Sequence, residues 1–257
     1  MGDRFGGEAQ LRKAEFLAEV TNKVLQELVI RCAKTEVIRD YFQVAVVGYG
    51  VGKNGVASAL GGALQGRDFV KISELAENPV RVDTRTKKIP DGAGGLVDTN
   101  VRFPVWVDPR NENGTPMCSA IRYAQKLVTE WLSEHGSCFP PIVLHITDGE
   151  SGDGDPRPLA KELTSLSSTD GGVLFFNCHV SSSKAPKVIF PSDDSGLPDE
   201  PSRVLYESSS VVPSAFSAAA KEHGINLSET TRGFVFNADP VDLVQFFEIG
   251  TRPSNLR

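Results

Sequence analysis

The residues with the most obvious chemistry lie in the stretch Pro140–Gly154, where an apolar run is followed by a polar, glycine-rich loop. The run Ile142–Ile146 is rich in β-branched residues, which is typical of a strand buried on both faces of a parallel sheet. Asp148 follows this strand directly, and in an open α/β sheet ligands bind just past the carboxyl ends of the strands. Asp148 is therefore a candidate ligand-binding carboxylate, although an Asp in this place can also simply cap a turn.

The same loop resembles the active-site turn of a serine hydrolase. Ser151 lies within Gly-Glu-Ser-Gly-Asp, which differs from the Gly-x-Ser-x-Gly nucleophile elbow because Asp153 fills the last glycine position. His179 or His223 could serve as the base, but neither follows an obvious acid. A serine hydrolase with Ser151 as nucleophile is thus the alternative function, and a sulfonyl label on Ser151 would support it.

Two carboxylates of the loop, Asp153 and Asp155, could instead bind calcium, which prefers oxygen ligands. The EF-hand pattern counted from Asp148 fails, because Gly152 stands at its fifth position and Asp153 replaces its turn glycine. His145 lies inside the apolar strand, and we interpret it as a hydrogen-bonded core residue rather than a ligand.

A second glycine-rich turn, at residues 48–55, follows the predicted strand Phe42–Val47. A Rossmann fingerprint would need glycine at position 53, and a P-loop would need Ser or Thr at position 54. The chain has Lys53 and Asn54 there. We interpret this segment as a turn and not as a phosphate site.

The composition of the 257-residue chain limits the class of protein. Its formal net charge of −6 and the absence of a basic stripe argue against nucleic-acid binding. No apolar run is long enough to cross a membrane, and no signal peptide opens the sequence. The four cysteines are widely spaced beside apolar runs, so we expect reduced core thiols in the cytoplasm: Cys32, Cys118, Cys138 and Cys178.

Alternating strand and helix patterns place these residues in an α/β fold. The helical patterns cover residues 11–32, 72–77, 115–134, 156–166, 214–223 and 241–249, and the strand patterns cover residues 42–47, 103–107, 142–147, 172–180, 188–190 and 234–237, the last as an edge strand. We expect one domain, residues 1–257, with a Rossmann-like open, mostly parallel sheet, helices on both faces and a surface insertion at about 58–102. Phe42–Val47, Ile142–Thr147 and Val173–Val180 should be neighbouring parallel strands.

Two motifs in this order resemble a von Willebrand factor type A domain of the bacterial intracellular type. They are Gly114-Thr115-Pro116-Met117 before a helix, and Thr147-Asp148-Gly149 after a strand. The resemblance implies a metal-ion-dependent adhesion site in which Thr115 and Asp148 help to bind Mg²⁺ or another divalent cation, with one coordination position left for a partner carboxylate. Thr115 could also be the N-cap of its helix, with Pro116 in the first turn.

The first motif of that family, Asp-x-Ser-x-Ser after the central first strand, has no counterpart in this sequence. Met1 stands where the methionine following that motif would stand, so the first strand is expected to be missing. A start codon assigned too late, a strand supplied by another chain or a rearranged fold would each account for this, and we favour the first. With Thr115 and Asp148 alone, we expect weaker magnesium binding than in an N-terminally extended chain.

The resemblance implies a non-enzymatic, metal-ion-dependent protein-interaction module in the cytoplasm. Its partners would be proteins, encoded by neighbouring genes, and not nucleic acid or a membrane. The side chains of Thr115 and Asp148 should then lie within hydrogen-bond or one-water reach of each other at the carboxyl end of the sheet.

Overall fold

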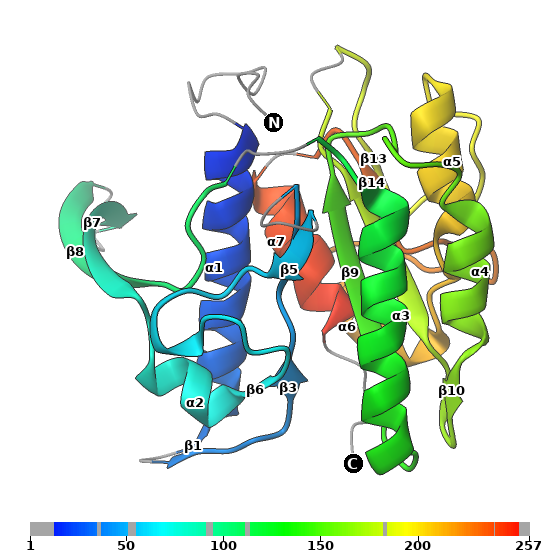
Figure 1. Cartoon of the computed structure of the whole chain (residues 1–257). Helices are drawn as coiled ribbons and strands as arrows, with labels where there is room; N and C mark the ends of the chain where they lie inside the picture. Colours follow the sequence, from blue (N-terminus) through cyan, green and yellow to red (C-terminus); the bar gives the residue numbers. More distant parts are fainter. Residues whose placement is uncertain are drawn as a thin grey trace. The chain divides into compact units, whose positions relative to one another are not determined.

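The computed structural model describes residues 13–34, 37–50, 55–90, 95–110, 114–181, 184–238 and 240–251. The chain divides into two compact units (Figure 1). The first unit comprises residues 1–17, 48–57 and 110–257, and the second comprises residues 18–47 and 58–109. We predicted that the segment 48–55 is a turn and not a phosphate site. It lies in part outside the described residues, because positions 51–54 are not among them.

The first unit is built on a four-stranded mixed sheet in the order β13-β14-β12-β9. Strands β9 (Ile142–Thr147) and β14 (Phe234–Phe236) both run parallel to β12 (Leu174–His179), and β13 (Val188–Ile189) runs antiparallel to β14. The ladder between β9 and β12 is unbroken from Ile142 opposite Leu174 to Thr147 opposite His179. The predicted α/β class, with parallel strands at these places, is confirmed.

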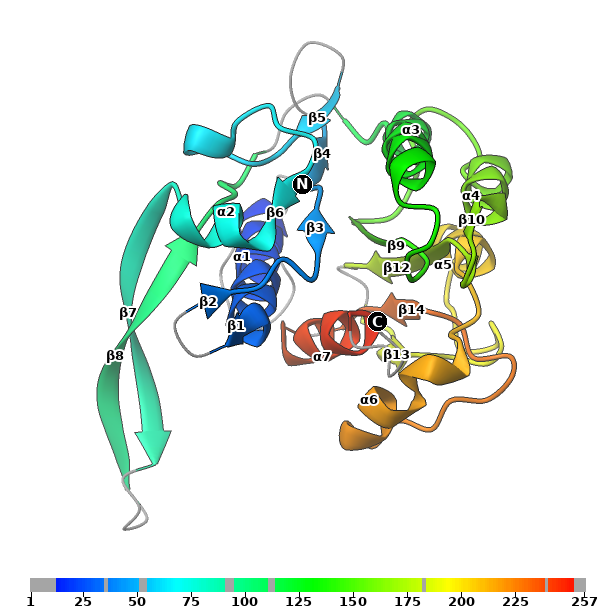
Figure 2. The same ribbon diagram turned by 90° about the horizontal axis from the view of Figure 1, so that it is seen from below.

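Helices cover both faces of this sheet, as Figure 2 shows. Alternate residues of a strand point to opposite faces. Phe175 therefore packs among residues of α3 (Met117–Glu134), α4 (Arg157–Ser165) and α5 (Glu200–Ser208). Its neighbour Phe176 contacts Phe246 of α7 (Pro240–Gly250) and Phe216 of the 3₁₀ helix Ser214–Phe216, which leads into α6 (Ser217–Glu222).

Two predictions about strand order are wrong. The segment 42–47 does not pair with β9, because β3 (Gln43–Val44) pairs antiparallel with β6 (Val70–Lys71), and β4 (Val47–Tyr49) joins β5 (Val56–Ser58). Among the described strands, β9 consequently lies at an edge of its sheet, whereas β14, predicted as an edge, lies between two strands. The connection from β3 to β6 is much shorter than the one from residue 47 to β9, so closing it costs less chain entropy.

The second unit contains most of α1 (Lys13–Cys32), the helix α2 (Ile72–Glu77) and a long hairpin of β7 (Arg81–Pro90) and β8 (Leu96–Val105). Two-residue strands β1 (Ala33–Lys34) and β2 (Val37–Ile38) follow α1, and the 3₁₀ helix Gly62–Leu64 precedes β6. The range 58–102, which we predicted to be a surface insertion of short strands, lies in this unit, but its hairpin strands are ten residues each.

The core of the second unit forms where one face of α1 meets Trp106 and α2. The side chain of Asn22 on α1 fixes this contact, because its Oδ1 accepts from the backbone nitrogens of Trp106 at 2.8 Å and Val107 at 3.0 Å, and its Nδ2 donates to the Val107 carbonyl at 2.8 Å. Within the described part of the chain, none of the helices has the length and apolar content needed to cross a membrane.

The remaining elements of the first unit are two short strands, β10 (Ser167–Ser168) and β11 (Gly171–Gly172), which form a small hairpin between α4 and β12. The helix predictions at 72–77, 115–134, 156–166 and 241–249 agree with the observed helices to within two residues at each end. Such agreement is expected because helix periodicity is a local property of the sequence.

A glycine next to β14 gives a test of this packing. An ideal Cβ atom at Gly233 would overlap the ring of Phe176, which is fully buried. Gly233→Ala should therefore lower the free energy of unfolding by about 1–3 kcal/mol through overpacking. Gly196→Ala is the matched control, since its Cβ would meet only Val188 Cγ2, at 3.5 Å. Urea unfolding measures both variants, and equal stability of the two would contradict this packing.

Candidate functional site

The carboxyl end of β9 presents Asp148 on a turn that only glycine can complete. Thr147 is fully buried, Asp148 is partly buried, and Gly149 has a backbone φ of +135°. A Cβ atom at Gly149 would lie 2.9 Å from Nε2 of His179, the last residue of β12. Both the positive φ and the imidazole require glycine at this position, so the ends of β9 and β12 together fix where Asp148 leaves the sheet.

Helix α3 begins beside this turn, and its cap differs from the predicted one. Pro116, not Thr115, occupies the N-cap position, and no capping bond comes from its side chain. The capping oxygens come from Asp153, whose Oδ1 accepts from the Cys118 nitrogen at 2.8 Å and whose Oδ2 accepts from the Ser119 nitrogen at 2.9 Å. A carboxylate from another loop thus stabilises the first helical N–H groups, and the prediction that Thr115 is the N-cap is wrong.

The loops that carry Thr115 and Asp148 touch each other. The Gly152 nitrogen donates to the Thr115 carbonyl at 2.9 Å, and a Cβ atom at Gly152 would lie 3.2 Å from that oxygen. The same carbonyl accepts from the Met117 nitrogen at 2.8 Å. The structure therefore places the Thr115 backbone against the loop that begins at Asp148, while the closeness of their side chains stays a prediction.

The two carboxylates considered for calcium are both occupied by donors from the protein. Burial opposes ionisation of Asp153, but the bonds from Cys118, Ser119 and Ser151 outweigh it and hold the pKa of this carboxyl below its usual value. Ser119 contributes its hydroxyl as well as its nitrogen, at 2.8 Å from Oδ2. Among the described residues, no group of three or more His, Cys, Asp and Glu side chains could hold a metal ion.

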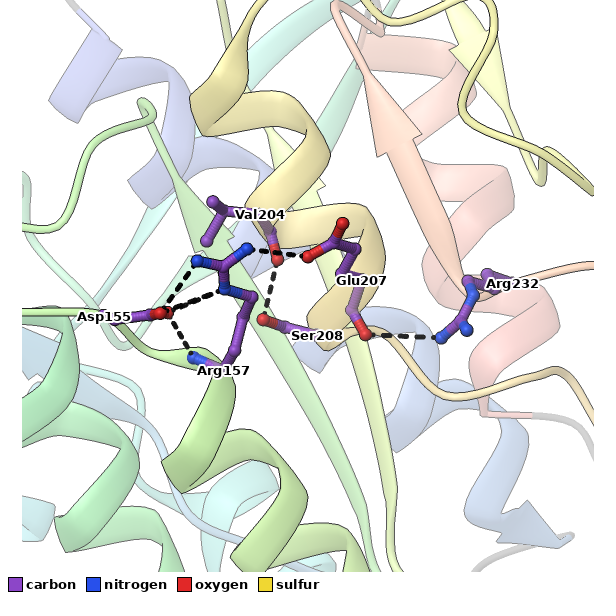
Figure 3. Close-up of polar contacts among 6 residues, drawn as sticks. All are labelled: Asp155, Arg157, Val204, Glu207, Ser208 and Arg232. Atoms are coloured by element: carbon purple, nitrogen blue, oxygen red, sulfur yellow. Dashed lines mark hydrogen bonds and ion pairs between the residues drawn. The ribbon is translucent and has the colours of Figure 1, made fainter.

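Asp155 belongs to a surface ion-pair network that joins α4 to α5 (Figure 3). Both of its oxygens accept from the Arg157 guanidinium at 2.9–3.0 Å, and Arg157 also donates to Glu207 at 2.9 Å. Arg232 extends the network by donating to the Glu207 carbonyl at 3.3 Å. The hydrogen bonds of Arg157 lower the pKa of Asp155. Arg157 itself links α4 to α5 through Glu207.

Ser151 lies beside the α3 N-terminus rather than beside a base. Its Oγ donates to Asp153 at 3.1 Å and lies 3.7 Å from the sulfur of Cys118. His223 pairs with Glu248 of α7 at 3.3 Å, on the other face of the sheet, and His179 lies against Gly149. In the described part of the chain, the recorded partners of the Ser151 hydroxyl are a carboxylate and a thiol.

A buried polar network crosses the ladder behind this site. Nδ1 of His145 lies 2.7 Å from Oδ1 of Asn177, whose Nδ2 donates to Ser209 at 3.0 Å, so Oδ1 accepts and Nδ1 carries the proton. Nε2 of His145 lies 3.3 Å from the Tyr49 hydroxyl, which donates to the Ile146 carbonyl at 2.7 Å. Burial raises the pKa of Tyr49 and keeps this hydroxyl protonated. The prediction that His145 is a hydrogen-bonded core residue is confirmed.

Sequence reasoning missed Asn177 and Tyr49. A signal for Asn177 was present, because a single amide inside the apolar strand Leu174–His179 must find a buried partner. Tyr49 gave no comparable signal, since its contact with His145 joins residues 96 positions apart.

Comparison of the chain with known protein families, with curated proteins and with solved structures found no match in any of the three. The resemblance to von Willebrand factor type A domains therefore rests on the two motifs at Thr115 and Asp148.

The α3 cap can be tested by removing its charge. Asp153→Asn should lower the free energy of unfolding by about 1 kcal/mol, because an amide cannot accept from both helix nitrogens and carries no charge for the helix dipole. Asp155→Asn is the matched control on the same loop, and we expect it to have the smaller effect because its ion pair is exposed. Urea unfolding at neutral pH compares them, and a larger loss for Asp155→Asn would contradict the assignment of the cap.

The same comparison repeated at lower pH checks the sign of the electrostatic effect. Because the pKa of Asp153 is lowered in the folded state, its stabilisation is present above the ordinary Asp pKa and is lost as the pH falls through the folded pKa. The difference between wild type and Asp153→Asn should therefore shrink in acid.

The buried histidine makes stability depend on pH in a separate range. Burial lowers the pKa of His145 from 6.5 to about 4, against a smaller opposing effect of Asn177. Between these values the unfolded chain binds a proton that the folded chain does not, so stability falls as the pH falls, in total by roughly 3 kcal/mol. His145→Asn keeps a donor near Nδ1 and does not titrate, so its unfolding free energy should fall less between pH 7 and pH 4. If the urea midpoints of the two proteins fell by the same amount between pH 7 and pH 4, this prediction would be contradicted.

Proposed function

We propose that the chain is a non-enzymatic protein-interaction module that binds Mg²⁺, or another divalent cation, through Thr115 and Asp148. One observation carries the proposal: the loop of Thr115 lies against the loop of Asp148 at the carboxyl end of β9, through the Gly152 to Thr115 hydrogen bond. Because Asp153 caps α3, the Thr115 hydroxyl is not required for that role. We therefore assign this hydroxyl the role of a metal ligand.

The donor set suits a hard cation. Asp148 offers carboxylate oxygens and Thr115 a hydroxyl oxygen, and magnesium prefers oxygen ligands in an octahedral shell that keeps several waters. When bound, the cation would supply a positive centre with little protein charge around it, to which a carboxylate of a partner protein can bind. With two protein ligands, most of the shell remains water, so we expect low affinity.

Other residues support the proposed site by holding its two loops in place. Gly152 allows the close approach of the two loops, and Gly149 lets the turn after Asp148 pass against His179. The capping bonds of Asp153 hold the start of α3, and thus the residues just before it, in place. Groups that orient ligands commonly affect metal affinity by an amount comparable to that of weak ligands.

The partner is proposed to be a protein with an exposed carboxylate, encoded by a neighbouring gene, and neither nucleic acid nor a membrane. The formal net charge of −6 disfavours nucleic acid. All four cysteines are free thiols in the structure, which suits the reducing cytoplasm in which we place the protein.

Calorimetric titration with MgCl₂ tests the site. Thr115→Val removes a ligand oxygen and Asp148→Asn removes the negative charge of a ligand, while each keeps the shape of the side chain, so each should weaken binding by about tenfold or more. Thr129→Val is the matched control, because Thr129 lies further along α3 and its hydroxyl bonds to the Gln125 carbonyl. Binding that is unchanged in the first two variants, or lost equally in the control, would contradict the proposal.

A further inference from the structure

The outer edge of β9 carries backbone groups that pair with no other strand among the described residues. The Leu174 nitrogen donates to the Pro141 carbonyl at 3.0 Å and the Val180 nitrogen to the Thr147 carbonyl at 2.8 Å, so odd-numbered residues of this segment bond to β12. Alternate residues of a strand direct their backbone groups to opposite edges. Ile142, Leu144 and Ile146 therefore direct theirs outward.

Of these outward groups, the Ile146 carbonyl accepts the Tyr49 hydroxyl. Among the strands that the structure describes, none pairs with this edge, since β9 has β12 as its single neighbour. The other outward groups, namely the three N–H groups and the carbonyls of Ile142 and Leu144, thus form a row of alternating donors and acceptors that pairs with no strand in the described part of the chain.

The two edges of this sheet differ in how they are protected. Natural proteins protect edge strands by keeping them short or by placing proline and lysine on them. At the far edge, β13 has two residues and lies between Pro186-Lys187 and Pro191. By contrast, β9 has six residues in unbroken register, and no proline, lysine, arginine or carboxylate interrupts Ile142–Thr147. It has the sequence of an interior strand.

The burial of the side chains also distinguishes β9 from a strand that has neighbours on both edges. All six residues of β12 are buried, whereas the four aliphatic residues of β9 are only partly buried: Ile142, Val143, Leu144 and Ile146. They point to both faces, with Val143 packed against the core beneath α3 and α4 and Leu144 beside Gly250 of α7. A further strand on this edge would remove apolar surface from water on both faces at once.

We propose that the outer edge of β9 accepts an extended, apolar segment of a partner protein as an additional strand. The row of alternating backbone donors and acceptors is complementary to an extended polypeptide, which gives affinity through main-chain bonds. The partly buried aliphatic side chains on both faces select a segment with β-branched residues at consecutive positions. This inference rests on the sheet and does not depend on the metal site.

A synthetic peptide tests the proposal directly. The probe is a short peptide of valine, isoleucine and threonine between terminal lysines, labelled for fluorescence anisotropy. Two matched versions carry N-methyl groups, the first on every second residue and the second on every residue. Because the first version keeps one edge free to dock and the second has both edges blocked, the first should bind like the parent and the second should lose roughly tenfold or more. Equal binding of both versions, or no binding of the parent, would overturn the proposal.

Hydrogen exchange locates the binding. In the protein alone, the amides of Ile142, Leu144 and Ile146 should exchange faster than those of Val143, His145 and Thr147, and the peptide should slow the first group. Slow exchange of the first group without peptide, through a dimer of the chain or otherwise, would overturn the proposal.

A protein variant provides a second measurement. Ile142→Pro removes an outward N–H at the first position of the strand, where proline is tolerated, and should weaken the peptide by several-fold while thermal unfolding stays cooperative. Unchanged affinity in a folded variant would count against docking at this edge. If the variant does not fold, the N-methylated peptides still decide.

Discussion

The parallel ladder between β9 and β12 is the constraint on which the rest of the first unit depends. Its register sets His145 opposite Asn177 and Thr147 opposite His179. The first pair forms the buried bond at the centre of the polar network, and the second brings the His179 ring against Gly149. A shift of one residue would turn every side chain to the other face. The apolar pattern that drives the strands into the core therefore also fixes where Asp148 emerges.

Helix α3 is joined to this ladder by a charge from outside the helix. Asp153 lies 35 positions after Cys118, yet it accepts the helix nitrogens that a local cap would otherwise satisfy. This arrangement ties the loop after β9 to the start of α3, so that the two motifs near Thr115 and Asp148 are held together by one carboxylate and by the Gly152 bond. A local cap would stabilise the helix but would leave the loops independent.

The two edge strands of the sheet differ strongly. One side ends in a short antiparallel strand beside prolines, while the other ends in a long, aliphatic parallel strand. Tyr49 satisfies one carbonyl of the open side and at the same time reaches His145, which links that edge to the buried polar network.

The sequence by itself determined several of the helices and strands of this protein, because periodicity and β-branching are local, but not the ten-residue strands β7 and β8. The strand Ile142–Thr147 and the helix Ile72–Glu77 were predicted with their observed bounds, and His145 was assigned to the core. The tertiary structure decided what no local pattern encodes, namely which segments pair and which side chains reach each other. It paired Val44 with Val70, and it gave the α3 cap to Asp153 instead of Thr115. Pairing and capping depend on the burial and hydrogen bonding of segments that are far apart in the sequence. A short stretch of sequence therefore does not reveal them.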